Sequence, residues 1–215
     1  MKQRKNTTLY VGIGFLIVFL IWTLLVRTLD RQGIGPEGST VGFASLNHAF
    51  FTYTGVHFSL YLLTDWLSLL PLGLIFGFAL WGLCQWIRRK SLWRVDFDIL
   101  VLGGFYAAVL TIYLLFEFVV INYRPVLIEG VLEASYPSST TMLVLCVMLT
   151  AWMILQKRIL NKTRNRLVCI LILAFTAFMV MGRLVSGVHW ITDIIGGILL
   201  SAGLVTLYRF FSRLK

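Results

Sequence analysis

The residues most able to do chemistry lie in one segment near the C-terminus, residues 182–197, with the sequence GRLVSGVHWITDIIGG. If the chain is helical from His189 onward, His189 and Asp193 lie four residues apart on one helix face. A carboxylate beside an imidazole fixes its tautomer and stabilises its charged form, which prepares a histidine to act as nucleophile or base. The alternative is a structural polar pair at the start of a helix. Together with Arg183, however, these are ionisable groups at the edge of an apolar span, where charges are costly and usually functional. The segment is therefore a candidate site.

The composition indicates an integral membrane protein. Of 215 residues, 59% are hydrophobic and only 13% are charged, whereas soluble domains are about a quarter charged. The net charge of +10 does not indicate nucleic-acid binding, because the basic residues fall in short loops between apolar runs, as in the positive-inside pattern. Cys84, Cys146 and Cys169 have no metal-site spacing, and we expect them to be reduced, small hydrophobic residues.

The apolar runs predict an all-α fold, a six-transmembrane-helix bundle in a single domain covering residues 1–215. We expect Pro71 to kink the second span, the aromatic part of the first connection, around Phe50, to form an interfacial helix, and Asp96 and Asp98 to cap the third span. No small-residue cleavage site follows the first span, so we expect an anchor and not a removed signal peptide. The predicted spans are about 9–26, 61–87, 97–121, 138–155, 167–184 and 190–210.

The distribution of basic residues predicts the orientation in the membrane. Six spans place both termini on one side, and that side carries 15 of the 19 Lys and Arg residues. This includes a basic N-terminal tail over residues 1–8. The other four are Arg27, Arg31, Arg124 and Arg183. The bias predicts a multi-pass plasma-membrane protein with cytoplasmic termini and an extracytoplasmic site.

Polar residues from separate parts of the chain are predicted to meet at that outer face. Two arginines can clamp a phosphate through forked, charge-assisted hydrogen bonds. A helix start rich in hydroxyl groups, residues 136–141, also favours an anion. The candidate residues are Arg124, Ser138, Ser139, Arg183, His189 and Asp193.

These residues resemble the motifs of the type 2 phosphatidic acid phosphatase (PAP2) superfamily. The family has three blocks, KxxxxxxRP, PSGH and SRxxxxxHxxxD. The third is matched by Arg183, His189 and Asp193, with Gly182 in place of serine; the first is matched by the pair at 124–125 and the second by the pair at 137–138. The resemblance covers about residues 117–197 and implies a helical bundle with a phosphohistidine mechanism. In that mechanism His189 attacks phosphorus, Asp193 orients it, and both arginines hold phosphoryl oxygens.

Two departures from the family pattern concern the acid half of the mechanism. The first-block lysine falls at Glu117, and the second-block glycine and histidine fall at Ser139 and Thr140. In the family that histidine protonates the leaving group, which threonine cannot do. An alkoxide leaving from a monoester needs a proton, whereas a phosphate leaving from a diphosphate, with its second pKa of about 6, needs one much less.

Three other residues bear on the missing acid. His48 and His57 are candidate replacement acids, although interfacial polar residues are the more ordinary explanation of both. Glu117 is expected to pair with Arg124 or Arg183, or to receive a cationic headgroup.

The sequence thus predicts a membrane lipid phosphatase that hydrolyses a lipid diphosphate, of the undecaprenyl diphosphate kind, at the extracytoplasmic face. The expected partners are the membrane and a lipid phosphate or diphosphate, and not nucleic acid. No metal or other cofactor is expected, because the site lacks clustered carboxylates. Two alternatives use the same pocket: a protein that binds or transports a lipid phosphate without cleaving it, and a lipid phosphotransferase.

Overall fold

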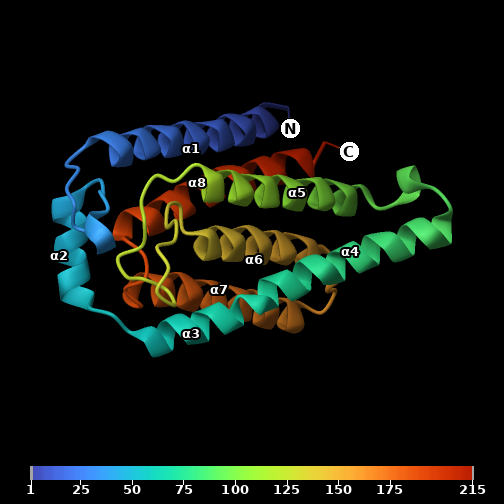
Figure 1. The fold of residues 1–215 in the computed structure, drawn as a ribbon. Helices are drawn as coiled ribbons and strands as arrows, with labels where there is room; N and C mark the ends of the chain where they lie inside the picture. Colours follow the sequence, from blue (N-terminus) through green and yellow to red (C-terminus); the bar gives the residue numbers. More distant parts are fainter. Residues whose placement is uncertain (1, 215) are drawn as a thin grey trace.

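The structure is a computed structural model that describes residues 2–214, with side chains from residue 6 onward. Figure 1 shows long helices lying side by side, with both termini at one end of the bundle. Among the described residues, six helical segments are long and apolar enough to cross a membrane, and there is no β-strand, which confirms the predicted all-α, six-span fold. The α-helices are α1 (Lys2–Thr28), α2 (Ala44–Thr54), α3 (Phe58–Leu67), α4 (Leu69–Arg89), α5 (Phe97–Phe118), α6 (Ser139–Arg158), α7 (Lys162–Val185) and α8 (Ile191–Phe211), with short 3₁₀ turns η1 (Pro36–Gly38) and η2 (Leu92–Arg94).

Helix α6 lies at the centre of the bundle. Of its most apolar window, 56% is buried within the protein, against 17% for α1. It contacts α4, α5, α7 and α8, whereas α1 packs along α8 on the outside. A helix that is apolar all round is stable in either place, because lipid and protein interior are both apolar. The central position of α6 therefore brings its first residues close to several other helices.

Small residues let α1 and α8 approach closely. A side chain at Gly12 would meet Leu207 at 2.8 Å, and one at Gly203 would meet Leu16 at 2.6 Å. Close contact through glycines is a common way for helices to associate where lipid offers no hydrophobic driving force. The helix begins at Lys2, so most of the predicted N-terminal tail belongs to α1. The basic side chains of Lys2, Arg4, Lys5 and Lys215 lie outside those described.

The predicted second span is divided into α3 and α4 at Ser68. Pro71 has no N–H, so the carbonyl of residue 67, four positions earlier, has no helical partner. The interruption falls where that hydrogen bond is missing. As Figure 1 shows, α3 and α4 follow one another along one side of the bundle. Helix α3 thereby becomes a separate element at the end of the bundle that carries α2, which we call the site end.

The connection before α3 fixes the start of α8. Helix α2, which includes the aromatic segment predicted to be interfacial, carries the buried side chain of Asn47. Its amide donates to Gly42 O (2.8 Å) and Thr192 Oγ1 (3.0 Å), and its Oδ1 accepts from the Thr192 N–H (3.3 Å). The Trp22 indole also donates to Thr192 O (3.2 Å). The first turn of α8, which carries Asp193, is therefore held by α1 and α2.

At the opposite end, the acids predicted to cap α5 do something else. No side-chain cap bond is formed there. Instead Asp96 accepts hydrogen bonds from Gln85 (3.0 Å) and Arg89 (2.8 Å), and Arg158 contacts both Asp96 (3.4 Å) and Asp98 (3.1 Å). The hydrogen bond from Arg89 is the main reason that the pKa of Asp96 lies below its ordinary value. This group of side chains joins α4, α5 and α6, so the capping prediction is wrong for Asp96.

We predict that Asp96→Ala destabilises the bundle, because it leaves a glutamine and two arginines without their shared acceptor. The expected loss is about 1 kcal/mol, because hydrogen bonds to a charged group contribute less where the side chains are partly exposed to solvent. Thermal unfolding in detergent micelles would measure it. The matched change Arg166→Gln, at an exposed position of α7, should leave the melting temperature unaltered. Equal melting temperatures for Asp96→Ala and the unaltered protein would contradict this role.

Candidate active site

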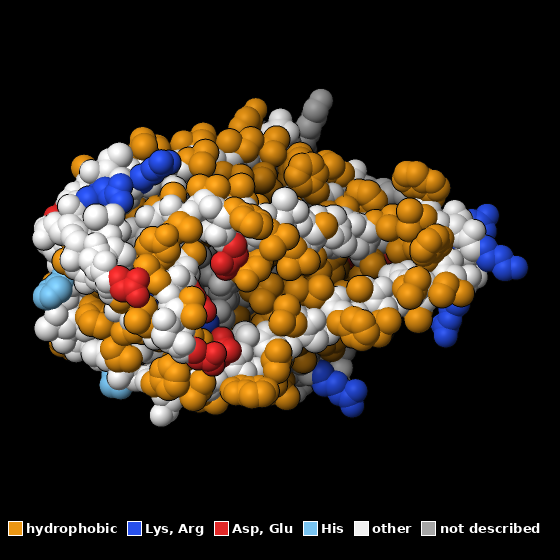
Figure 2. Space-filling model, in the orientation of Figure 1, with side chains coloured by type: hydrophobic (Ala, Val, Ile, Leu, Met, Phe, Trp, Pro, Cys, Tyr) orange, Lys and Arg blue, Asp and Glu red, His pale blue; other side chains and the backbone are white. Residues whose placement is uncertain are grey.

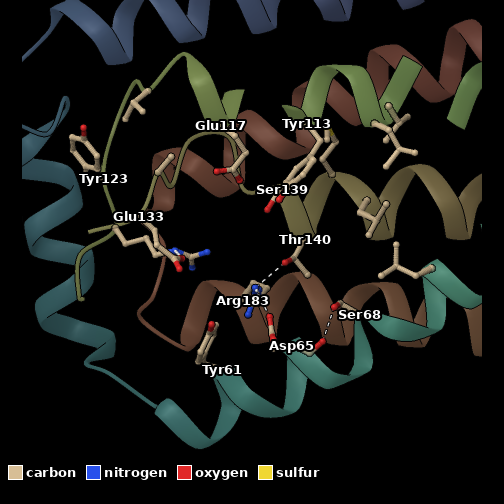
Figure 3. Close-up of a pocket in the computed structure, with 18 of the residues that line it drawn as sticks. Tyr61, Asp65, Ser68, Tyr113, Glu117, Tyr123, Glu133, Ser139, Thr140 and Arg183 are labelled. Atoms are coloured by element: carbon tan, nitrogen blue, oxygen red, sulfur yellow. Dashed lines mark hydrogen bonds and ion pairs between the residues drawn. The ribbon is translucent and has the colours of Figure 1, made fainter. Parts of the chain in front are cut away.

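A cavity of about 710 Å³ opens between α3, α5, α6, α7 and the loop of residues 119–138. In Figure 2 the hollow lies in the middle of one face, with acidic side chains around it. Figure 3 shows the polar side chains that project into it from separate elements. The charged and hydroxyl residues that line it are Tyr61, Asp65, Ser68, Tyr113, Glu117, Tyr123, Arg124, Glu133, Ser139, Thr140 and Arg183.

The loop after α5 positions Arg124 by folding back on itself. Tyr123 pairs with Ala134 in an isolated antiparallel bridge, and the Arg124 N–H donates to Glu133 O (3.0 Å). The side chains of these two residues then lie together, with Arg124 Nε 2.9 Å from Glu133 Oε2. The Trp190 indole donates to Tyr123 O (2.7 Å), which ties this loop to the segment before α8. Arg124 is 9% exposed, so its charge is held in a defined place at the cavity wall.

Arg183 reaches the same cavity from the end of α7. Its Nη2 donates to Thr140 Oγ1 (2.7 Å) and pairs with Asp65 Oδ1 (3.3 Å), and its Nη1 lies 3.4 Å from Thr64 Oγ1. The guanidinium also stacks over the Tyr61 ring at 5.0 Å. A buried charge is costly unless it is paired and hydrogen-bonded, and these contacts from α3 and α6 meet that requirement.

His189 and Asp193 are adjacent, although α8 begins only at Ile191. His189 therefore precedes the helix, while Asp193 lies in its first turn and accepts the Trp190 N–H at Oδ2 (2.9 Å). His189 Nδ1 lies 3.7 Å from the same oxygen. On the other side of the ring, His189 Nε2 lies 3.4 Å from Arg124 Nη1. Because a guanidinium only donates, Nε2 must accept and the ring proton belongs on Nδ1, facing the carboxylate.

Glycines allow the turn that carries His189 to pack closely. Gly187 has φ +71°, and a side chain there would meet Gly55 O at 2.2 Å. At the start of α8, a side chain at Gly196 would meet the Tyr136 ring at 2.7 Å. The backbone therefore approaches its neighbours closely both before and after His189.

Burial and positive neighbours lower the pKa of His189 well below its ordinary value of 6.5. Burial is the largest cause, followed by the charges of Arg124 and Arg183. The imidazole is therefore neutral near pH 7, with its lone pair on Nε2 directed toward Arg124. A neutral, oriented imidazole beside two guanidinium groups is suited to attack an anionic phosphorus centre.

The structure brings some of the predicted residues together and separates others. Arg124, His189 and Asp193 form one connected group, in which Arg124 lines the cavity and His189 and Asp193 lie behind it. Arg183 lines the same cavity together with Ser139 and Thr140, and it contacts Thr140. Ser138 does not line the cavity: it is buried, and its Oγ caps α6 by accepting the Thr141 N–H (3.4 Å).

The three residues considered in connection with the missing acid do not join this group. His48 and His57 are exposed and are not among the residues that line the cavity. Glu117 does line it, but the arginines pair with other acids, Arg124 with Glu133 and Arg183 with Asp65.

Sequence reasoning missed Asp65 and Glu133, the two acids that pair with the arginines. Asp65 had a signal, because it is the one charged residue within the apolar segment 61–87, and ionisable residues inside spans are usually functional. Glu133 had none, since it is one acid in a polar loop, and only the folded loop shows that it faces Arg124.

Comparisons with known proteins concern the fold and the family. Residues 118–214 match the model of the PAP2 superfamily. Among solved structures, the fold is similar to a transmembrane PAP2 type phosphatidylglycerolphosphate phosphatase from Bacillus subtilis, with a TM-score of 0.62 and 18% sequence identity, covering 96% of this chain and 100% of that one. A search of curated proteins found no match.

We predict that His189 stays neutral well below pH 6.5. In a His48→Gln/His57→Gln variant, His189 is the one remaining histidine, so ¹⁵N-histidine NMR in micelles reports it alone. We expect the Nδ1–H tautomer near neutral pH and a titration midpoint below 6.5. The unfolded chain binds this proton at higher pH than the folded one, so stability should fall as the pH drops below 6.5. The same sample in denaturant is the reference, and a folded midpoint at or above the denatured one would contradict the prediction.

Proposed function

We propose that this chain is a membrane lipid phosphatase of the PAP2 type, which hydrolyses a lipid diphosphate, of the undecaprenyl diphosphate kind, through a phosphohistidine on His189. The observation that carries the proposal is that His189 Nε2 lies 3.4 Å from Nη1 of Arg124, and that Arg124 and Arg183 both line the cavity. We also propose one domain for the whole chain, because α3 lies outside the matched region and yet lines the site.

The arrangement supports a two-step reaction. In the first step the lone pair of His189 Nε2 attacks the terminal phosphorus, and the bond to the bridging oxygen breaks, so that a lipid monophosphate leaves. Arg124 turns from Nε2 onto the phosphoryl oxygens, and Arg183 holds them from the other wall. The ring then carries positive charge, which the buried Asp193 carboxylate stabilises from the Nδ1 side. Arginine suits this task because its planar fork matches two phosphate oxygens.

The proposal of a lipid substrate is supported by a second, apolar cavity. This cavity of about 490 Å³ lies between α4 and α5 and is lined by apolar side chains such as Ile75, Phe78 and Leu102. Leu110 belongs to the walls of both cavities. The polar cavity therefore adjoins this apolar cavity, which could hold the hydrocarbon chain of an amphiphilic substrate.

The threonine at position 140 favours a diphosphate over a phosphate monoester as the substrate. Its Oγ1 accepts from Arg183, and a threonine hydroxyl has no readily donated proton for a departing alkoxide. The similar Bacillus subtilis protein is described as a phosphatidylglycerolphosphate phosphatase. Phosphatidylglycerolphosphate is a phosphate monoester, so its leaving group needs a proton, and Thr140 does not supply one. Binding without cleavage and phosphoryl transfer to a second lipid are the alternatives that the following assay separates.

We predict faster phosphate release from lipid diphosphates than from lipid monophosphates. The difference should reach about 10²–10⁴-fold in kcat, the usual contribution of a positioned acid, and Thr140→His should raise monophosphate hydrolysis more than diphosphate hydrolysis. The measurement is phosphate release from a panel of both classes by purified protein. His189→Ala should abolish release in either class.

Three results would count against the proposal. Equal rates on phosphatidic acid and a lipid diphosphate would overturn the leaving-group argument. No release from any lipid would favour a binding protein. Release that depends on an added acceptor lipid would favour a phosphotransferase.

We also propose that the site faces the extracytoplasmic side of the plasma membrane and that both termini are cytoplasmic. Figure 2 shows basic side chains at the end of the bundle where α4 is joined to α5, and others at the site end. The sequence places 15 of the 19 Lys and Arg residues on the side of the termini, which the positive-inside rule assigns to the cytoplasm. Single cysteines in a Cys-free background test this. An impermeant reagent added to intact cells should label position 130 but not position 162, and the reverse pattern would contradict the orientation.

A further inference from the structure

Asp65 is a charged group on the cavity wall that takes no part in the first step of the proposed reaction. It comes from α3, outside the matched PAP2 region. Its side chain is 54% exposed, whereas that of its ion-pair partner Arg183 is 3% exposed. The backbone carbonyl of Asp65 also accepts from the Ser68 hydroxyl, at the break between α3 and α4. One carboxylate oxygen is thus held by Arg183 while the rest of the group is open to the cavity (Figure 3).

Asp65 also lies near Thr140, where the PAP2 pattern has its acid–base histidine. The same nitrogen, Arg183 Nη2, contacts Asp65 Oδ1 at 3.3 Å and Thr140 Oγ1 at 2.7 Å. The carboxylate and the hydroxyl therefore share one guanidinium nitrogen, although they come from α3 and α6. The Asp65 carboxylate therefore lies in the part of the cavity that a longer side chain at position 140 would reach.

The second half of the reaction needs a proton acceptor. Water must lose a proton as it attacks the phosphorus of phosphohistidine, and most site residues cannot take it. Nε2 of His189 is then bonded to phosphorus, and arginine and threonine are not bases. Asp193 lies on the Nδ1 side of the ring and is fully buried. The acceptor must therefore be a carboxylate on the cavity wall, which leaves Asp65, Glu117 and Glu133.

The contacts of these three acids distinguish them. Glu133 is bound to Arg124, which contacts Nε2 itself, so it lies on the nucleophile's side. An in-line water must instead approach from the side opposite the P–N bond. Glu117 forms no ion pair with either arginine among the described contacts. Asp65 is fixed by the second arginine and is open to solvent, as a base acting on water requires.

We propose that Asp65 is the general base that activates water for hydrolysis of the phosphohistidine, an inference that rests on the proposed function. The water oxygen forms a bond to phosphorus as the P–N bond breaks. The electron pair of that bond returns to His189 Nε2, the water proton passes to the Asp65 carboxylate, and inorganic phosphate leaves. A carboxylate paired with a guanidinium can accept a proton but has none to give. Asp65 therefore accepts the proton in the second step. It does not supply the proton that the leaving group of a monoester needs in the first step.

The test is Asp65→Asn in the full-length protein with a ³²P-labelled lipid diphosphate. Asparagine keeps a carbonyl oxygen for Arg183 but cannot take the proton. We expect the first turnover to proceed, the acid-labile, alkali-stable phosphoenzyme to accumulate, and steady-state release to fall about 10²–10⁴-fold. Asp65→Glu should recover part of the rate, and added formate should accelerate Asp65→Gly. The matched control Glu129→Gln, an exposed acid that does not line the cavity, should behave like the unaltered protein.

The outcomes separate the two proposals. Normal steady-state release by Asp65→Asn would overturn the assignment. So would slower release without accumulation of phosphoenzyme, because Asp65 would then only position Arg183. If the unaltered protein itself releases no phosphate and forms no phosphoenzyme from any lipid phosphate, the proposed function fails and the assignment of Asp65 fails with it.

Discussion

The burial of two guanidinium groups beside a neutral imidazole is the constraint on which the rest of this structure depends. Arg183 is 2% exposed and Arg124 9%, and a charge in such a place is tolerated only with close partners. The partners of Arg183 come from α3 and α6, and that of Arg124 from the loop after α5. Satisfying these charges therefore joins four separate elements around one cavity. The same charges depress the pKa of His189, so the groups that would hold a phosphate also keep its nucleophile neutral.

The acids of the cavity give the site its individual character. Each arginine is paired with a carboxylate, Asp65 or Glu133, and a bound phosphate must share these guanidinium groups with them. Where the family pattern has a lysine and a histidine, this chain has Glu117 and Thr140. The cavity thus has a carboxylate in place of the lysine and lacks a proton donor at position 140. That chemistry suits a leaving group that departs as phosphate, followed by hydrolysis of a phosphohistidine by water.

The sequence was most informative where spacing and composition carry direct physical meaning. Apolar length predicted six spans, and the 183–189–193 spacing predicted the contact between His189 and Asp193, although the helix starts two residues later than expected. Partners far apart in sequence were not predictable. Asp96 was interpreted as a cap because it precedes a helix, yet Arg89 and Arg158 bind it from other elements. Asp65 was passed over within an apolar span, since only the break at Ser68 and the packing of α3 against α7 reveal its contact with Arg183.

The central claim is that His189 receives the phosphoryl group. The most direct measurement is a rapid quench of the purified protein with a lipid diphosphate labelled on its terminal phosphate, followed by mass-spectrometric mapping of the labelled peptide. Our account predicts label on His189, present within the first turnover and absent from a His189→Ala variant. Phosphate release at the normal rate with no label on His189, or with label on another residue, would contradict it.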